Sequence, residues 1–219
     1  MAAGLLPASA VAQDPNLVDQ GRYDITIGDR AAGTETFAIR RQGDGYMSVG
    51  RLQIEQGSAW LRSGEFGLRT DGAFAPLRYE TKSSDGGQGI RLTRAGTRIR
   101  VSNSTAEGER LTELLADPNQ VLLDPGIAQH YYFFVRRVTA GATGSLKALL
   151  PGEAQEVPIR LVGTTDTEVQ AAGSRQPARR YEFTVGGATH LVWADPADGR
   201  ILRVEVPDRQ WRSVRRAEN

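Results

Sequence analysis

The feature that most restricts the fold of this sequence is an alternation of apolar and polar residues with a period of two. Residues 23–27 have the sequence Tyr-Asp-Ile-Thr-Ile. The same alternation recurs in three later segments: 97–101, 180–185 and 202–206. Because successive side chains of a strand point to opposite faces, each segment predicts a strand with one apolar and one wet face. In the last segment, Leu202, Val204 and Val206 are expected to share the apolar face.

Short turn sequences separate these segments. Gly186-Gly187 is the clearest, because a two-residue hairpin turn needs positive φ angles, which glycine adopts without strain. Residues 195–199 form a longer turn sequence of the same kind. Short connections join antiparallel neighbours, whereas parallel strands need long crossovers. The sequence therefore predicts an all-β, mainly antiparallel fold, either a curved meander sheet or an open barrel or half-barrel.

One segment departs from this pattern and predicts a short helix near residues 125–138, packed on the sheet. Asp124-Pro125 is typical of a helix start, with Asp as the cap and Pro at the first helical position. Apolar residues then recur at helical spacing at Ile127, Tyr131, Phe134, Val135 and Val138. The run 130–135 also fits a buried strand, and that alternative stays open. The segment divides the chain into two β halves, 21–116 and 142–216.

The charge balance and the absence of cysteine exclude several classes of protein. The chain of 219 residues carries 27 Lys and Arg against 26 Asp and Glu, and it has no Cys. A dedicated nucleic-acid binder usually has an excess of positive charge, so we expect no nucleic-acid partner. Without cysteine there is no disulfide, no thiolate metal site and no cysteine nucleophile.

The N-terminal residues indicate export. A short apolar stretch ends in Ala10-Val11-Ala12, the small-x-small pattern that signal peptidase accepts, although no basic region precedes it. Residues 1–20 are interpreted as a residual signal peptide and N-terminal arm, with a disordered apolar arm as the alternative. Residues 21–219 are expected to form a single β domain. No segment reaches the ~20 apolar residues of a membrane helix. We expect an exported protein of the bacterial periplasm or cell envelope, with no integral membrane span.

Motifs for catalysis or metal binding are absent from the sequence. The two histidines, His130 and His190, stand in no metal-binding pattern. Asp195 and Asp198 flank a glycine turn, which lacks the distal Glu of a calcium-binding loop. No nucleophile elbow or phosphate-binding loop occurs. We therefore expect no enzymatic activity, no catalytic residues, no metal and no cofactor.

Large aromatic side chains are numerous for one modest sheet. They either form the core, where each buries a large apolar area, or line an apolar pocket between the helix and the sheet. Under the second alternative the ligand-binding residues are Trp60, Phe66, Tyr131, Phe134 and Trp193.

Pairs of arginines occur at four places: Arg40-Arg41, Arg136-Arg137, Arg179-Arg180 and Arg215-Arg216. On the polar face of strands such side chains solvate the sheet and discourage pairing of its edges. The alternative is that they attract anionic lipid headgroups.

Several segments follow one another in an order that resembles a known family. They are the opening hairpin 23–35, the aromatic segment 123–136, the strand 157–161 and the closing hairpin 191–207. Together they resemble a family of uncharacterised secreted bacterial β proteins, catalogued as a domain of unknown function of the 3108 type. The resemblance implies a curved antiparallel sheet with a helix against it. This implied fold is loosely similar to that of the periplasmic lipoprotein carriers, which hold acyl chains in an apolar cavity. The comparison with the carriers is an analogy of fold alone.

Three hypotheses of function follow. The first is non-catalytic binding of a lipid or a lipoprotein acyl chain between the helix segment 131–134 and the sheet. The second is an envelope protein–protein interaction module that docks its partner by strand addition at an open edge. The third is an unrecognised hydrolase, which needs carboxylates or a His–carboxylate pair in a cleft.

Overall fold

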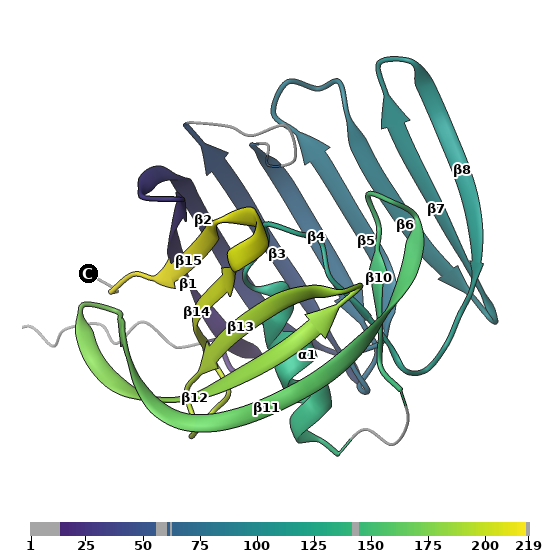
Figure 1. Ribbon diagram of the computed structural model, residues 1–219. Helices are drawn as coiled ribbons and strands as arrows, with labels where there is room; N and C mark the ends of the chain where they lie inside the picture. The colour runs from purple at the N-terminus through teal and green to yellow at the C-terminus, as the bar shows by residue number, and fades with distance from the viewer. Residues whose placement is uncertain (1–13, 56–60, 62, 142–144, 218–219) are drawn as a thin grey trace, which may run out of the picture.

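The computed structural model describes residues 14–55, 61, 63–141 and 145–217. These residues form one continuous 15-stranded sheet, an α-helix, α1 (His130–Thr139), and a 3-10 helix, η1 (Pro207–Arg209). The sheet curves round α1 without closing (Figure 1), which confirms the predicted open, mainly antiparallel β fold with one short helix. The strands are β1 (Leu17–Ile27), β2 (Arg30–Gln42), β3 (Gly45–Ile54), β4 (Gly64–Thr70), β5 (Pro76–Ser83), β6 (Gly89–Ala95), β7 (Arg98–Thr105), β8 (Gly108–Leu115), β9 (Gln120–Leu122), β10 (Lys147–Leu150), β11 (Gln155–Ala171), β12 (Ser174–Val185), β13 (Ala188–Ala194), β14 (Ile201–Val206) and β15 (Trp211–Arg215).

The sheet consists of two meanders that meet at its centre. Strands β1 to β8 are neighbours in the order of the sequence, and so are β9 to β15. The two meanders are joined because β1 pairs antiparallel with β15, with Tyr23 opposite Arg215 and Ile27 opposite Trp211. We call this pairing the seam. It places the first and last strands of the chain side by side in the middle of the sheet.

A buried ion pair lies at the seam. Arg215 donates hydrogen bonds to both carboxylate oxygens of Asp19, at 3.0 and 2.7 Å, and each of these residues is 5% exposed. The guanidinium also lies over the ring of Phe37, 5.6 Å from its centroid. Gly21 leaves room for the guanidinium, since a Cβ there would lie 2.9 Å from an Arg215 nitrogen. Strand β1, which carries Asp19, begins at Leu17. Its first residues thus lie within the segment 1–20 that was interpreted as a leader and arm.

The alternation seen in the sequence matches the buried and exposed faces of most strands. Tyr23, Ile25, Ile99 and Val101 are buried as predicted. The alternating apolar residues of β12 (Tyr181, Phe183 and Val185) are buried too. Residues 186–187 form the predicted hairpin turn between β12 and β13, and the Asp195 carboxylate accepts the backbone N–H of Ala197 in the next turn.

Leu202 lies on the opposite face from the one predicted. A register shift in the β13–β14 ladder makes it the extra residue of a β-bulge. Ile201, rather than Leu202, joins Val204 and Val206 in the main core. Leu202 instead belongs to a small apolar cluster on the outer face, against which Trp193 packs.

The helix lies at the centre of the core and begins later than predicted. Its first six residues, 130–135, are buried inside the curved sheet, and α1 forms the crossover between the parallel strands β9 and β10. The helix begins at His130 rather than at Pro125, and the segment just before it is held by another strand. Glu35 of β2 accepts the backbone N–H groups of Ala128 and Gln129 at 2.7 and 3.1 Å. Among the described residues, no helix has the length and apolar character needed to cross a membrane.

Candidate ligand-binding site

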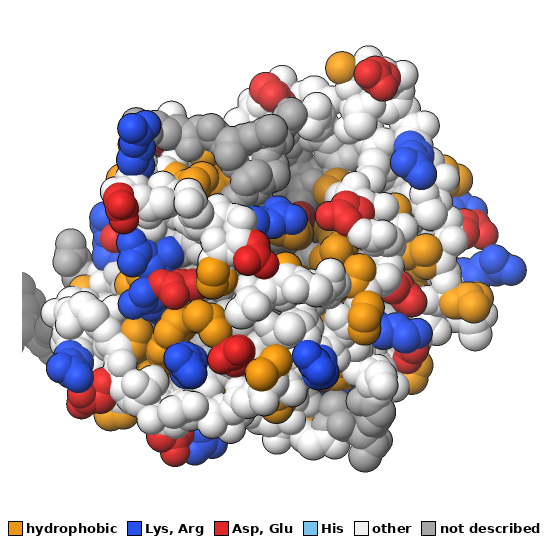
Figure 2. Space-filling model, in the orientation of Figure 1, with side chains coloured by type: hydrophobic (Ala, Val, Ile, Leu, Met, Phe, Trp, Pro, Cys, Tyr) orange, Lys and Arg blue, Asp and Glu red, His pale blue; other side chains and the backbone are white. Residues whose placement is uncertain are grey.

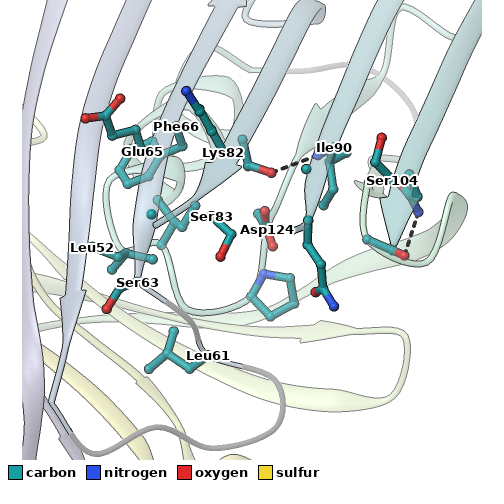
Figure 3. Close-up of a pocket in the computed structure, with 18 of the residues that line it drawn as sticks. Leu52, Leu61, Ser63, Glu65, Phe66, Lys82, Ser83, Ile90, Ser104 and Asp124 are labelled. Carbon is teal, nitrogen blue, oxygen red and sulfur yellow. Dashed lines mark hydrogen bonds between the residues drawn. The ribbon is translucent and has the colours of Figure 1, made fainter. Parts of the chain in front are cut away.

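A cavity of about 480 Å³ lies between the first meander and the segments that precede α1 and follow β10. Strands β4 to β7 form one wall, and residues 124–127 and 152–153 form the other. Asn103 of β7 bridges the two walls, since its Nδ2 donates a hydrogen bond to the carbonyl oxygen of Gly152 at 2.9 Å. Figure 2 shows the molecule hollowed between its two halves, and Figure 3 shows the side chains that surround this hollow.

The lining of this cavity is apolar where it is buried and polar where it is exposed. The buried lining side chains are Leu52, Leu61, Phe66 and Ile127, each at most 6% exposed. The exposed ones are polar or charged: Glu65, Lys82, Ser104, Thr105 and Glu153. Concave sites of a few hundred Å³ with this division are typical of small-molecule binding.

Phe66 reaches the cavity because the residue opposite it is a glycine. Gly50 of β3 pairs with Phe66 of β4, and a Cβ at Gly50 would lie 2.4 Å from Cζ of the phenyl ring. On its other side the ring meets His130 edge-on, with the centroids 5.9 Å apart. The ring is thus held between β3 and α1, and its exposed edge forms part of the cavity wall.

Asp124 brings a titratable carboxyl to the cavity. The Tyr79 hydroxyl donates a hydrogen bond to Oδ2 of Asp124, and the backbone N–H of Asp124 donates to Nδ1 of His130 at 3.1 Å. Desolvation raises the pKa of Asp124 to about 6, while the Tyr79 hydroxyl and the charge of Arg209 act in the opposite direction. A carboxyl with a shifted pKa beside a cavity is a frequent property of binding and catalytic sites.

His130 is a structural part of this wall. It is fully buried between the rings of Phe66 and Tyr79, with centroids 5.9 and 5.4 Å away. Burial lowers the pKa of His130 to about 3, so the ring is neutral at physiological pH. Because Nδ1 accepts a hydrogen bond, the proton resides on Nε2. This Nε2 has no hydrogen-bond partner among the residues that the structure describes.

Glu35 fixes the position of the segment that carries Asp124. Its carboxyl is fully buried and binds the N–H groups of Ala128 and Gln129. Burial raises the pKa of Glu35 to about 8, against the two backbone hydrogen bonds, which lower it. The sequence analysis did not single out Glu35, although a signal exists. Glu35 shares one face of its strand with the buried Phe37 and Ile39, where a carboxyl needs a specific partner.

The other histidine lines a second, smaller cavity of about 60 Å³. Nδ1 of His190 lies 2.7 Å from the Tyr131 hydroxyl, and both residues are buried. Burial lowers the pKa of His190 to about 4. This cavity is about one eighth of the volume of the first.

Five residues were predicted to bind one ligand, and the structure disperses the four of them that it describes. Phe66 lines the larger cavity and Tyr131 the smaller one. Phe134 is fully buried against Phe183, with ring centroids 4.1 Å apart. Trp193 lies on the outer face of β13, 5.0 Å from the Arg203 guanidinium. Trp60 lies outside the described residues.

The interior face of α1 is therefore filled by core side chains, and the larger cavity lies beside the segment that precedes the helix. Within the described ranges, no group of three or more His, Asp or Glu side chains is placed to hold a metal ion.

Comparison with known proteins identifies a relative in fold. No protein-family model matches the sequence, and no curated protein matches it. The structure is similar to the crystal structure of a β-barrel-like protein of domain of unknown function DUF1849 from Brucella abortus. The two share 12% sequence identity over 90% of this chain and 95% of that chain, with a TM-score of 0.53. This similarity confirms a barrel-like all-β fold shared with an uncharacterised domain. It does not extend to the 3108-type family, which stays a prediction.

Proposed function

We propose that this protein binds, without converting it, one amphipathic ligand of the lipid or acyl-chain class in the larger cavity. The observation that carries the proposal is the cavity of about 480 Å³, which combines the buried apolar side chains of Leu52, Leu61, Phe66 and Ile127 with exposed polar side chains. Burial of an apolar chain there contributes roughly 25 cal/mol per Å² before the costs of ordering the ligand.

The polar part of the lining favours a ligand with a polar end. Ser63, Ser83 and Gln88 offer hydrogen-bonding groups, and Asp124 and Arg209 offer charges of opposite sign. A wholly apolar ligand would remove water from these groups and replace none of its hydrogen bonds, which costs free energy. The ligand class is therefore amphipathic.

We also propose that the protein is exported to the periplasm or envelope of a bacterium. The support is the sequence Ala10-Val11-Ala12, which lies outside the described residues, and the resemblance to the secreted 3108-type family. The analogy with the lipoprotein carriers, which hold acyl chains inside a curved sheet, agrees with both parts of the proposal at the level of fold.

Filling the cavity is expected to prevent ligand uptake. Ile90 of β6 lines the cavity, and Ile90→Trp replaces its aliphatic side chain with a bulkier indole. Leu161→Trp is the matched control, since the Leu161 side chain is 42% exposed on β11. We expect native mass spectrometry, with organic extraction, to find a stoichiometric lipid on the wild type and on Leu161→Trp. Ile90→Trp should retain about tenfold less, because the indole takes up space that the ligand needs; tenfold corresponds to about 1.4 kcal/mol of binding free energy.

A wild-type protein that is purified from its own cells without ligand, and that also fails to retain a fluorescent fatty-acid probe, would refute this function. Equal retention of lipid by Ile90→Trp would place the ligand outside this cavity. Circular dichroism of both variants verifies that they are folded.

A second candidate function, docking of an envelope protein, is favoured by the free edge of β11. Strand β10 pairs with β11 only over residues 155–158, and every residue of β11 from 160 to 168 is exposed. Leu161 and Val162, at a bulge in this strand, are 42% and 52% exposed. An unpaired strand edge is a template for strand addition by a partner.

Photo-crosslinking in cells tests this second function. A photoreactive residue at Val162 is expected to give one discrete protein adduct, and the same residue at Gln53, exposed on the face of a central strand, none. Thr165→Pro removes a backbone N–H from the β11 ladder and is expected to abolish the adduct. The absence of any adduct at Val162 rejects docking at this edge.

A further inference from the structure

A row of arginines crosses the outer face of the first meander. Residues that lie directly opposite one another from β2 to β7 form this arginine row: Arg40, Met47, Arg69, Arg78, Thr93 and Arg100. All six are exposed. The side chains of Arg78 and Arg100 are 61% and 64% exposed, and Met47 is 41% exposed. None of these six residues lines the larger cavity, so the arginine row is a separate surface.

Three carboxylates pair with the arginine row and its neighbours, and they do not balance all of its positive charge. Asp14 pairs with Arg40 at 3.1 Å. Glu80 pairs with both Arg78 and Arg91, at 2.9 and 3.5 Å. Glu113 similarly serves two arginines, Arg98 and Arg100, at 3.3 and 3.2 Å. Glu80 and Glu113 therefore each balance two guanidinium groups with a single carboxylate.

Arg69 and Arg78 lie directly opposite each other on neighbouring strands. Like charges in this position destabilise a sheet. Among the described residues, no acidic side chain forms an ion pair with Arg69. The free protein thus carries an unfavourable contact that a bound anion would relieve.

Protection of sheet edges does not account for these arginines. Charged side chains discourage aggregation when they lie on an edge strand. Strands β2 to β7 are all paired on both sides and expose no edge (Figure 1). The charges therefore lie on the face of interior strands, where edge protection is not needed.

Apolar side chains on the same face indicate the kind of anion. Met47 lies within the arginine row, between Arg40 and Arg69. At the β8 end of the face, Leu111 and Leu115 are 55% and 72% exposed. Arginines with exposed aliphatic side chains between them suit a lipid–water interface, where guanidinium groups bind phosphates and the aliphatic groups enter the headgroup layer. A soluble polyanion would leave these apolar side chains in water.

We propose that the outer face of β2 to β8 docks on an anionic phospholipid surface through the arginine row. The planar guanidinium groups bind lipid phosphates in bidentate fashion. Met47, Leu111 and Leu115 enter the interfacial layer. This docking surface does not depend on the ligand cavity, because no residue of the arginine row, nor Leu111 or Leu115, lines that cavity.

Sedimentation with vesicles tests the docking surface. The wild type is expected to bind vesicles of phosphatidylglycerol mixed with phosphatidylcholine, to release them at high salt, and to leave pure phosphatidylcholine vesicles unbound. A surface arginine contributes about 1 kcal/mol to binding of an anionic membrane, or about fivefold in affinity. Arg69→Gln with Arg78→Gln should therefore weaken binding roughly 25-fold, and Arg69→Gln alone about fivefold.

A matched control separates this surface from net charge alone. Arg30→Gln with Arg160→Gln removes the same charge from exposed positions outside the arginine row and is expected to bind like the wild type. Equal weakening by both double variants would overturn the proposal, as would equal binding of polyphosphate and vesicles. Ile90→Trp should bind vesicles like the wild type. The vesicle measurement therefore tests the docking surface even if the cavity proposal fails. Thermal unfolding of each variant verifies its fold.

Discussion

Asp19→Asn is expected to lower the free energy of unfolding by about 3–5 kcal/mol, since it leaves a buried guanidinium without its counter-charge. Arg215 donates to both carboxylate oxygens of Asp19 across the first and last parts of the chain, and its guanidinium also donates to the carbonyl oxygen of Gln20. Urea unfolding at neutral pH measures the loss. Replacement of both partners, Asp19→Leu with Arg215→Met, is expected to recover most of it, because well-packed apolar residues often substitute for a buried ion pair.

Asp24→Asn is the matched control for this prediction. Asp24 lies on the same strand and pairs with the next arginine, Arg216, at 2.8 Å, but these two side chains are 44% and 49% exposed. Exposed ion pairs contribute about 0–1 kcal/mol. If Asp19→Asn and Asp24→Asn lower the free energy of unfolding by the same amount, burial of the Asp19–Arg215 pair is not what stabilises the seam.

The pH dependence of stability should change when Glu35 is replaced by glutamine. The folded-state pKa of Glu35 is about 8, above its ordinary value of 4.5, because the carboxyl is buried. The native state therefore favours the protonated carboxyl. The stability that Glu35 contributes is complete below pH 4.5 and is lost as the pH rises through 8. At 1.36 kcal/mol per pKa unit the loss amounts to about 5 kcal/mol.

Glutamine does not ionise, so Glu35→Gln is expected to gain about 5 kcal/mol relative to the wild type between pH 4.5 and pH 9. Urea unfolding at a series of pH values measures this difference. Glu35→Ala is expected to be less stable than the wild type at low pH, because it leaves two buried N–H groups at the helix start without an acceptor, at about 1–3 kcal/mol each. Glu65→Gln, at an exposed position, is the control. If the free energies of unfolding of Glu35→Gln and the wild type change with pH in the same way, the raised pKa of the buried Glu35 carboxyl is wrong.

The sequence predicted those parts of the fold that depend on local pattern. Strands such as β1 and β12 follow from alternation alone, and the turn at residues 186–187 follows from glycine. Leu202 could not be placed from the pattern, because one extra residue in a ladder reverses the faces of the residues beyond it. The bulge depends on how β13 and β14 pair, and that information is not local.

The start of the helix and the candidate site depend on partners that are distant in sequence. Asp124-Pro125 has the composition of a helix start, but the Tyr79 hydroxyl binds Asp124, and Glu35 binds the N–H groups of Ala128 and Gln129, just before the helix begins at His130. The cavity arises where β4 to β7 meet the segment that precedes α1, so no single stretch of sequence encodes it. Phe66 was predicted as a binding residue from its aromatic ring. Its place in the wall requires Gly50 on the neighbouring strand.

The seam constrains the order in which the chain assembles. Strand β15 is synthesised last, yet it lies at the centre of the sheet, between β14 and β1. Both meanders therefore present an open, full-length edge until the final residues arrive, and the contacts that close it join opposite ends of the chain. Such long-range contacts slow folding, and partly folded chains with open edges are prone to aggregate. A chain shortened by its last strand would keep nearly all of its hairpins and lose the strand that joins them into one sheet.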